Sequence, residues 1–438
     1  KCIEDEIPFE VPEGWAWCKL NDIYNFIDYR GATPTKITNG IPLVTAKNVK
    51  SGYIDYTIDD YISEEEFKER QQRGISKKGD ILFTTEAPLG NAALADMEKF
   101  SAGQRLITFQ QYGSKNELIN YVMLMFILSD FFQQQLYVNK TGSTVAGIKA
   151  AILKTLWIPV PPYNEQLRIS NTLKSAINLI DSISKNKEIL STSISNTKSK
   201  ILDLAIRGKI VPQDPNDEPA SVLLERIRAE KEELIKQGKI KRDKKESVIF
   251  KGDDNSYYGI HLPDSWNWAS LREIALSISD GSHNPPPNNG SGIPLLSAAN
   301  INDNSILMNE ISRWITNEEW KIENQRTNIE VGDVLLTIVG SIGRSAVVQN
   351  NNHFALQRSV AVIKPCLINP LYLMHIVQSP QIQKWLTDNS KGTAQKGIYL
   401  NALSLMIIPI PPLAEQARIV EHIHIAYKHL DLISNALL

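Results

Sequence analysis

The longest hydrophobic pattern in the chain has a helical period. Apolar residues recur at alternating steps of four and three over 169–204, with Lys187 and Thr197 as polar interruptions. Such a heptad pattern is typical of a helix that buries one narrow apolar stripe against another helix. We therefore predict one helix over 164–205, about 60 Å long at about 1.5 Å per residue. A second helix, polar and rich in Glu and Lys, is predicted over 220–237.

The apolar stripe returns in the same register near the end of the chain, over 419–437. A helix with one apolar stripe must bury it, and the nearest similar stripe lies on the other helix. We therefore expect long antiparallel coiled-coil helices that separate two domains with pseudo-twofold symmetry. The alternative is that each helix packs only on its own domain. The predicted seam consists of Ile169, Leu173, Ala176, Ile180, Ile183, Leu190, Ile194, Ile201, Leu204, Ile419, Ile423, Ala426, Leu430, Ile433 and Leu437.

Outside these helices, short apolar runs end at Gly, Asn or Pro, as strands do. The predicted strands are 41–45, 80–85, 106–110, 295–298, 333–338 and 360–364. Each group of strands is followed by one apolar helix, expected over 118–137 in the first group and over 371–387 in the second. Strands that come first and helices that follow favour an α+β fold over a doubly wound α/β sheet.

The two groups are copies of one another. Residues 12–20 read PEGWAWCKL and residues 263–271 read PDSWNWASL, while IPVPPYNEQLRI from Ile158 returns as IPIPPLAEQARI from Ile408. A repeat this long is not a solenoid unit of roughly 20–50 residues. We predict two duplicated globular domains, over 1–157 and 251–407, with a central helical region over 158–250 and a distal helix over 408–438. The repeated tryptophans are expected to anchor the cores rather than to stack on bases.

Composition narrows the class of protein. Hydrophobic residues make up 42% of the 438 residues, and the three cysteines show no metal-binding spacing. No apolar run is long enough for a membrane span, so we expect a cytoplasmic protein.

The net charge of −2 does not by itself suggest a nucleic-acid binder. Only residues 158–250 are basic, with 17 Lys and Arg against 13 Asp and Glu. Any DNA binding would therefore depend on local loops or on a partner.

The two ends of the sequence also carry an expectation. The chain begins at Lys1 rather than Met, and the distal helix has fewer residues than the central one. We expect a trimmed N-terminus, and either a truncated distal helix or a shorter distal pairing.

No catalytic motif is found. Residues 284–287 read NPPP, close to an adenine-methyltransferase signature, but Pro287 replaces the aromatic residue that would stack on the base. No phosphate-binding loop is present. Glu165 and Glu415 lie at corresponding helix starts, where a carboxylate suits the helix dipole. The sequence therefore predicts a chain that is not an enzyme and that holds no cofactor and no metal.

Several repeated motifs together resemble the specificity subunit of type I restriction-modification systems. They are the PEGW-type opening, the GDILFT or GDVLLT strand, the later Gln-Arg pair, the GTAQKGI loop from Gly392, and the IPxPPxxEQxRI entry into a heptad helix. The stretch AIRGKIVPQDPNDEPASVLLERIRAEKE from Ala205 is also typical of that family's central region. The resemblance covers the whole chain.

The resemblance implies a function and a set of partners. Each globular half would be a target recognition domain that reads one part of a bipartite, asymmetric site in double-stranded DNA, and the helices would set the spacing. Two modification (methyltransferase) subunits, with S-adenosylmethionine as their cofactor, would dock on the helices. Restriction (endonuclease) subunits would bring ATP and Mg. Two alternatives are a DNA-free coiled-coil scaffold with paired protein-binding domains and the recognition part of a longer enzyme.

The candidate DNA-contacting residues lie in loops, many of which differ between the copies. In the first copy they are Arg30, Thr33, Thr35, Lys36, Lys47, Asn48, Asn91, Ser143 and Thr144. In the second copy they are Ser282, His283, Asn284, Asn300, Arg344, Thr393, Gln395 and Lys396. Arg suits guanine, and Asn or Gln suits adenine, as partners for base edges.

Overall fold

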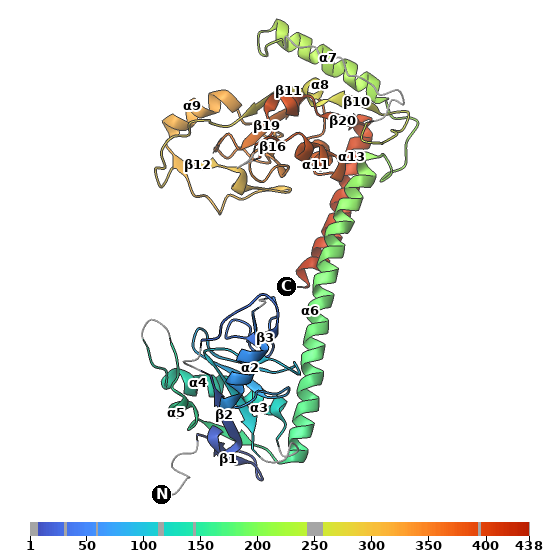
Figure 1. The fold of residues 1–438 in the computed structure, drawn as a ribbon. Coiled ribbons are helices and arrows are strands. Elements are labelled where there is room, and N and C mark those ends of the chain that lie inside the picture. The colour runs from blue at the N-terminus through green and yellow to red at the C-terminus, as the bar shows by residue number, and fades with distance from the viewer. Residues whose placement is uncertain are drawn as a thin grey trace. The chain divides into compact units, whose positions relative to one another are not determined.

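The chain folds into two compact units, which we call unit 1 (Lys1–Ser184) and unit 2 (Lys185–Leu438). The computed structural model describes residues 8–29, 33–57, 60–112, 118–142, 146–242, 257–392 and 396–437. Each unit combines sheets with helices, and their elements follow one another in nearly the same order (Figure 1). The predicted α+β class is therefore confirmed, and the duplication extends to the three-dimensional structure.

Unit 1 is built on a four-stranded antiparallel sheet. Its strands lie in the order β2–β8–β5–β6, and β8 pairs with both β2 and β5. A three-stranded sheet, β4–β3–β7, and the pair β1–β9 complete the strands. Their bounds are β1 Ala16–Lys19, β2 Tyr24–Asp28, β3 Ile41–Val44, β4 Tyr61–Ile62, β5 Ile81–Thr85, β6 Leu89–Leu94, β7 Ser101–Ala102, β8 Leu106–Gln111 and β9 Trp157–Val160.

Both faces of this sheet are buried. Successive side chains of a strand point to opposite faces, so Ile81 and Phe83 of β5 join the core under the helix over Asn120–Leu128, whereas Leu82 joins a second core with Phe100. Every residue of β5 is buried. This two-sided burial explains why the strand reads as a continuous apolar run that ends in two threonines, without polar alternation.

Unit 2 repeats this arrangement. Its main sheet has the order β11–β19–β16–β17, its three-stranded sheet is β15–β12–β18, and β10 pairs with β20. A short hairpin, β13–β14, corresponds in unit 1 to a single antiparallel bridge between Val49 and Ile54. The bounds are β10 Asn267–Ser270, β11 Ala275–Asp280, β12 Ile293–Leu296, β13 Ile301–Asn302, β14 Ser305–Ile306, β15 Trp314–Ile315, β16 Val334–Thr337, β17 Ser345–Val347, β18 Ala355–Leu356, β19 Val360–Pro365 and β20 Ile407–Ile410.

Helices cover the sheets of each unit. Those of unit 1 are α1 Leu20–Ile23, α2 Glu64–Arg70, η2 Gln71–Arg73, α3 Asn120–Leu128, α4 Asp130–Val138, α5 Ala150–Leu153 and the first part of α6 Tyr163–Ile206. Those of unit 2, besides the rest of α6, are α7 Ala220–Lys236, α8 Leu271–Ile274, η3 Ala298–Asn300, α9 Asn317–Thr327, α10 Pro370–Val377, α11 Pro380–Asp388, α12 Leu400–Ser404 and α13 Leu413–Asn435. The predictions for the central and Glu-rich helices agree with α6 and α7 within one or two residues.

The helices predicted over 118–137 and 371–387 are each broken in two. In unit 1 the backbone of Ser129 is extended, and its hydroxyl accepts a hydrogen bond from Phe132 N, so α3 ends and α4 begins there. In unit 2 Ser379 has the same conformation and is followed by Pro380, which cannot continue the preceding helix. The prediction of one long helix was wrong because a Ser cap inside an apolar run hardly changes its periodicity.

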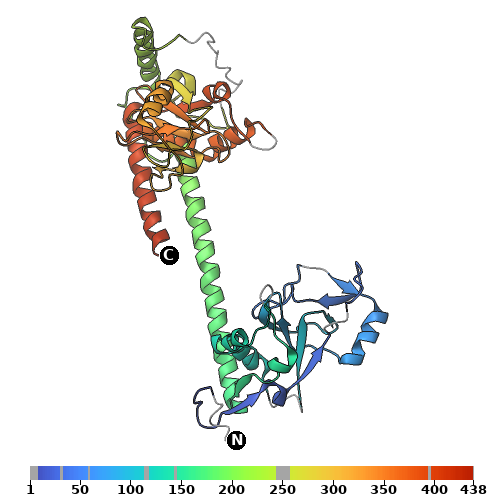
Figure 2. The same ribbon diagram turned by 90° about the vertical axis from the view of Figure 1, so that its left-hand side faces the viewer.

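The C-terminal part of α6 pairs with α13 inside unit 2 (Figures 1 and 2). Lys198 forms an ion pair with Asp431, and its carbonyl accepts a hydrogen bond from Tyr427 Oη. Ala205, at the other end of the contact, shares a core with Ile419. From one contact to the next, residue numbers decrease along α6 as they increase along α13. The two helices are therefore antiparallel, as the sequence predicted.

The predicted seam is only partly buried. Ile194, Ile419 and Ile423 are buried, and Ile169, Leu173, Ile201, Leu204, Ala426, Leu430 and Leu437 are half-buried. Ile180 and Ile183, however, are 60% and 58% exposed, and Ala176, Leu190 and Ile433 are exposed as well. The prediction is wrong for these five positions within the described structure. For the four positions on α6 the reason is geometric, because α6 has 44 residues and α13 has 23, so α13 covers only part of the stripe. Ile433 lies on α13 itself and is 46% exposed near the end of that helix.

The prediction that the tryptophans anchor the cores is confirmed in unit 2, where Trp268 packs against the core that contains Trp266, but not in unit 1, where Trp15 and Trp17 are only half-buried. Trp266 is buried in the core of unit 2, and Trp17 of unit 1 packs edge-on against Phe9. Helix α7 packs on unit 2 through Lys231, whose ammonium donates to the carbonyl oxygens of Arg272 and Ala275 at 2.7 and 2.9 Å. None of the helices within the described ranges combines the length and the apolar character needed to cross a membrane.

Candidate nucleic-acid interface

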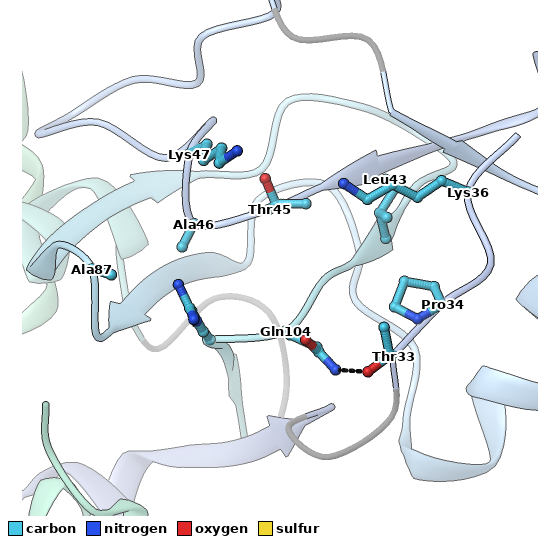
Figure 3. A pocket seen from close by; sticks show the side chains of 10 residues that line it. Thr33, Pro34, Lys36, Leu43, Thr45, Ala46, Lys47, Ala87 and Gln104 are labelled. Carbon is cyan, nitrogen blue, oxygen red and sulfur yellow. Dashed lines mark hydrogen bonds between the residues drawn. The ribbon is translucent and has the colours of Figure 1, made fainter. Parts of the chain in front are cut away.

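A cleft of about 200 Å³ opens at one edge of the main sheet of unit 1 (Figure 3). β5 ends at this edge and the antiparallel β8 begins there, with Thr84 opposite Leu106. Gln104 donates a hydrogen bond from its amide to the Thr33 hydroxyl across the cleft. The lining residues are Thr33, Pro34, Lys36, Leu43, Thr45, Ala46, Lys47, Ala87, Gln104 and Arg105.

Arg105 is held at the cleft by its backbone and by one carboxylate. Its φ of 64° places it in a left-handed turn just before β8. The Arg105 carbonyl accepts hydrogen bonds from Thr85 N at 2.9 Å and Thr85 Oγ1 at 3.1 Å. Its Nε lies 3.0 Å from Glu86 Oε1, and both side chains are about half exposed. This exposed ion pair contributes little to stability, so the guanidinium can exchange partners at low cost.

Unit 2 has a larger cleft, about 540 Å³ in volume, at the corresponding edge of its sheet. There β16 ends and β19 begins, with Thr337 opposite Val360. Four side chains that can carry positive charge line this cleft: His283, Arg326, Arg358 and Lys391. The edge is thus the same in both units, but the side chains that surround it differ.

One buried carboxylate organises the cleft of unit 2. Asp280, at the end of β11, is 7% exposed. Its Oδ2 lies 2.8 Å from His283 Nε2, and its backbone carbonyl accepts a hydrogen bond from Arg326 Nε at 2.9 Å. Arg326 Nη2 also donates to the carboxylate of Asp280. Asp280 therefore orients an imidazole that comes from a loop and a guanidinium that comes from α9.

Asn48 and Asn300 lie inside their units, at odds with their predicted role in DNA binding. Their side chains are 2% and 4% exposed. In each case the amide oxygen accepts from the backbone N–H of the residue three positions earlier, at 2.9 Å, and the amide nitrogen donates to a backbone carbonyl across the loop, at 2.9 Å. Both amides are already used to close a turn, so neither can easily reach a base.

Other predicted residues are also engaged inside the units. Ser282 is 6% exposed, and its hydroxyl donates to Glu323. Asn91 donates to the Val49 carbonyl at 3.0 Å. Lys36 pairs with Asp60 at 2.7 Å, although it still lines the cleft of unit 1.

The remaining predicted residues are mostly exposed. Thr33 and Lys47 line the cleft of unit 1, and His283 lines that of unit 2. Thr35, Asn284, Arg344 and Lys396 are exposed outside these two clefts. Arg30, Ser143, Thr144, Thr393 and Gln395 lie outside the described residues.

Several cleft residues were not predicted. Gln104 with Arg105, and Arg358 in the second copy, belong to a Gln-Arg pair that recurs in the sequence, which was a usable signal. Arg326 and Lys391 had no such signal. The two Gln-Arg pairs do not occupy equivalent positions in the structure. Thr85 and Ile338 are equivalent in the two repeats, but Thr85 N donates to the Arg105 carbonyl, whereas Ile338 N donates to the carbonyl of Ser359. Sequence matching alone therefore misplaces Arg358 by one residue.

The clefts offer donors of hydrogen bonds. Guanidinium, ammonium and amide groups suit phosphate oxygens and the acceptor atoms of base edges. In the part of the chain that the structure describes, no group of three His, Cys, Asp or Glu side chains could hold a metal ion.

Solved structures share this fold. The chain is similar to the HsdS subunit from Thermoanaerobacter tengcongensis, with a TM-score of 0.54 and 18% identity over 99% of this chain and 94% of that one. A chain from a structure of complex assembly and conformational transition of the type I R-M system aligns with a TM-score of 0.61 and 18% identity, over 98% of this chain and 94% of that one.

Sequence comparisons identify the family. Over 97% of its length the chain is 23% identical to the type I restriction enzyme EcoBI specificity subunit of Escherichia coli, of which the match covers 81%. The EcoAI specificity subunit of the same organism is 34% identical over 240 residues, 52% of this chain and 38% of that protein. Residues 12–191 and 263–437 match the type I restriction modification DNA specificity domain. The chain therefore belongs to the specificity-subunit family of type I restriction-modification systems.

Proposed function

We propose that each unit reads one part of a bipartite, asymmetric DNA site and that the chain contributes recognition without catalysis. The observation that carries this proposal is the pair of clefts at the same edge of two equivalent sheets. Lys47 and Arg105 line the first cleft, whereas Arg326 and Arg358 line the second. A shared frame with different donors is what two different half-sites require.

The chemistry of readout follows from these groups. Arg105 and Arg358 can donate two hydrogen bonds to the O6 and N7 atoms of guanine, and the Gln104 amide can pair with adenine. Lys47 is exposed at the rim of its cleft and suits a phosphate, which positions the duplex without reading it.

Partner subunits would supply the rest of the activity. The net charge of −2 leaves little general attraction for DNA. We propose that two modification subunits dock on the helices, supply further contacts to the DNA backbone and methylate adenine with S-adenosylmethionine. Restriction subunits would add cleavage driven by ATP with Mg. The names of the related proteins support membership in such an assembly.

We propose that α6 sets the spacing between the two half-sites. The helix is unbroken over Tyr163–Ile206. Seven residues inserted between Ile183 and Leu190, which are exposed on α6, add about 10 Å, or roughly three base pairs. The non-specific gap of the site should lengthen by that amount while both half-sites stay the same. An unchanged gap would exclude α6 as the spacer.

A test of readout compares single substitutions in the two clefts. The chain is assembled with its modification subunit, and methylated adenines are mapped across a genome. Arg105→Ala should relax or change only one half of the motif, and Arg358→Ala only the other half. Asp181→Ala, which removes an exposed charge from α6, is the matched control and should change neither. Equal effects of both arginine substitutions on both halves would contradict the proposal.

A further inference from the structure

A loop that follows α6 closes over one face of unit 2. Gly208, with a φ of 64°, begins the loop and lies so close to Pro263 that an added Cβ would approach its Cγ to 2.5 Å. The loop returns to the same turn at its other end, where Ala220 N donates to the Ser265 carbonyl at 2.9 Å. Residues 208–219 therefore form a cover over the turn that contains Trp266.

Under this cover lies a cluster of polar groups. The Glu415 carboxylate, 0% exposed, accepts hydrogen bonds from Trp266 Nε1 at 2.9 Å and from Gln213 Nε2 at 2.6 Å. Next to it, Arg418 forms a two-pronged ion pair with Asp217. Gln213 and Asp217 of the cover thus satisfy two charged side chains of α13.

Unit 1 has the same frame around the equivalent positions. Trp15 N donates to the Pro12 carbonyl at 3.0 Å, as Trp266 N donates to that of Pro263 at 3.0 Å. Gln166 and Gln416 likewise make equivalent hydrogen bonds. The amide nitrogen of each donates to the carbonyl of the residue five positions earlier, and the amide oxygen accepts from the backbone N–H of the residue just before α3 or α10. Trp15, Glu165 and Arg168 therefore occupy the places of Trp266, Glu415 and Arg418.

Among the described residues, no side chain pairs with Glu165 or Arg168 as Gln213 and Asp217 pair with Glu415 and Arg418. The indole N–H of Trp15 is buried but has no hydrogen-bond partner within the described ranges. Glu165 is half-buried, whereas Glu415 is fully buried. Ile169 and Leu173 are also half-buried, whereas their counterparts Ile419 and Ile423 are fully buried. A buried donor without an acceptor costs free energy, and a loop like that of unit 2 would fix Glu165 where it can accept.

We propose that the face of unit 1 formed by Pro12, Trp15, Glu165, Arg168 and Ile169 is a docking site for a second polypeptide segment with the chemistry of residues 202–217. That chemistry is an apolar helix end, a glycine turn, and then an amide and a carboxylate four residues apart. The chain's own segment is held by unit 2, so the occupant is another segment of this pattern. The site is independent of DNA reading, because a carboxylate at its centre disfavours phosphate and favours a neutral amide donor.

The test uses the full chain and a synthetic peptide that copies residues 198–220. The indole N–H resonance of Trp15 is identified from its loss in Trp15→Phe and followed as peptide is added. The resonance should shift, and Glu165→Ala should weaken peptide binding about tenfold. Asp181→Ala is the matched control on the same helix. A peptide with alanine in place of Gln213 and Asp217 should also bind about tenfold more weakly.

A second experiment joins the segment covalently to the chain, so that binding no longer depends on the concentration of free peptide. A copy of residues 202–258 is placed directly ahead of Pro8, which reproduces the connection that leads into Gly259 in unit 2. The tether raises the effective concentration of the segment. Hydrogen exchange between the Trp15 indole N–H and water should then slow, because the segment covers this group. The proposal is overturned if Trp15 responds neither to millimolar peptide nor to the tethered copy. It is also overturned if the alanine-substituted segment works equally well, or if only duplex DNA shifts the resonance.

Discussion

Substitution of Asn300 by alanine tests whether the amide is a structural clamp or a contact to DNA. The Asn300 side chain is 4% exposed at the end of η3. Its Oδ1 accepts from Ser297 N at 2.9 Å and from Ser297 Oγ at 3.3 Å, and its Nδ2 donates to the Glu310 carbonyl at 2.9 Å. Alanine removes all three hydrogen bonds and leaves the backbone N–H and the carbonyl without these partners.

The expected loss of stability follows from these contacts. A hydrogen bond contributes about 1 kcal/mol net, and a buried group left without a partner costs about 1–3 kcal/mol. Together they give a loss of about 3 kcal/mol for unit 2. For a unit of this size, each kcal/mol lowers Tm by roughly 2–4 °C. The Tm of unit 2 should therefore fall by about 6–12 °C.

Urea unfolding, followed by tryptophan fluorescence, measures this loss. The matched control is Asn284→Ala, in the same unit, because Asn284 is exposed and none of the described hydrogen bonds uses its side chain. The control should change stability by less than about 0.5 kcal/mol. Asn48→Ala should destabilise unit 1 as Asn300→Ala destabilises unit 2. An Asn300→Ala variant with normal stability but altered DNA recognition would refute the structural role.

Three further predictions follow from contacts and charges. Burial lowers the pKa of His375 to about 4, so as pH falls the unfolded chain takes up the proton before the folded chain does, and unit 2 should lose on the order of 3 kcal/mol of stability between pH 6.5 and pH 4. Denaturation curves for His375→Leu should lack this loss. If the unfolding free energy of this variant depends on pH as steeply as that of the original chain, the prediction is wrong. Lys231→Met removes the hydrogen bonds that hold α7 to the carbonyls of Arg272 and Ala275, so limited proteolysis of α7 should speed up, whereas substitution of the exposed Lys236 should have no effect. Lys47→Ala should weaken DNA binding by the assembled complex at every sequence and reduce the salt dependence by about one unit of slope; a loss confined to one sequence would instead indicate base readout.

Much of the frame was predictable because it depends on repeated local patterns. The heptad stripe predicted α6, and the repeated IPxPPxxEQ motif correctly predicted that a helix begins after each proline pair. The breaks at Ser129 and Ser379 were missed because a capping serine within an apolar run leaves the helical spacing intact. Local sequence thus predicted the elements better than their ends.

The candidate site was less predictable because it depends on contacts between distant residues. Asn is common both in exposed loops and in turns that its own amide closes, so the sequence could not show that Asn48 points inward. Arg326 is held at the cleft of unit 2 by Asp280, which is 46 residues away in the chain. Trp15 and Trp266 have nearly the same sequence context, yet among the described residues the indole N–H of Trp266 has a hydrogen-bond acceptor and that of Trp15 has none.

The central claim is that each unit reads its own part of one DNA site. The most direct measurement replaces residues 20–157 with the corresponding domain of a related subunit and maps adenine methylation by the assembled complex across a genome. The account predicts a bipartite motif in which one half changes and the other half stays the same. A motif that does not change, or one in which both halves change, would contradict it.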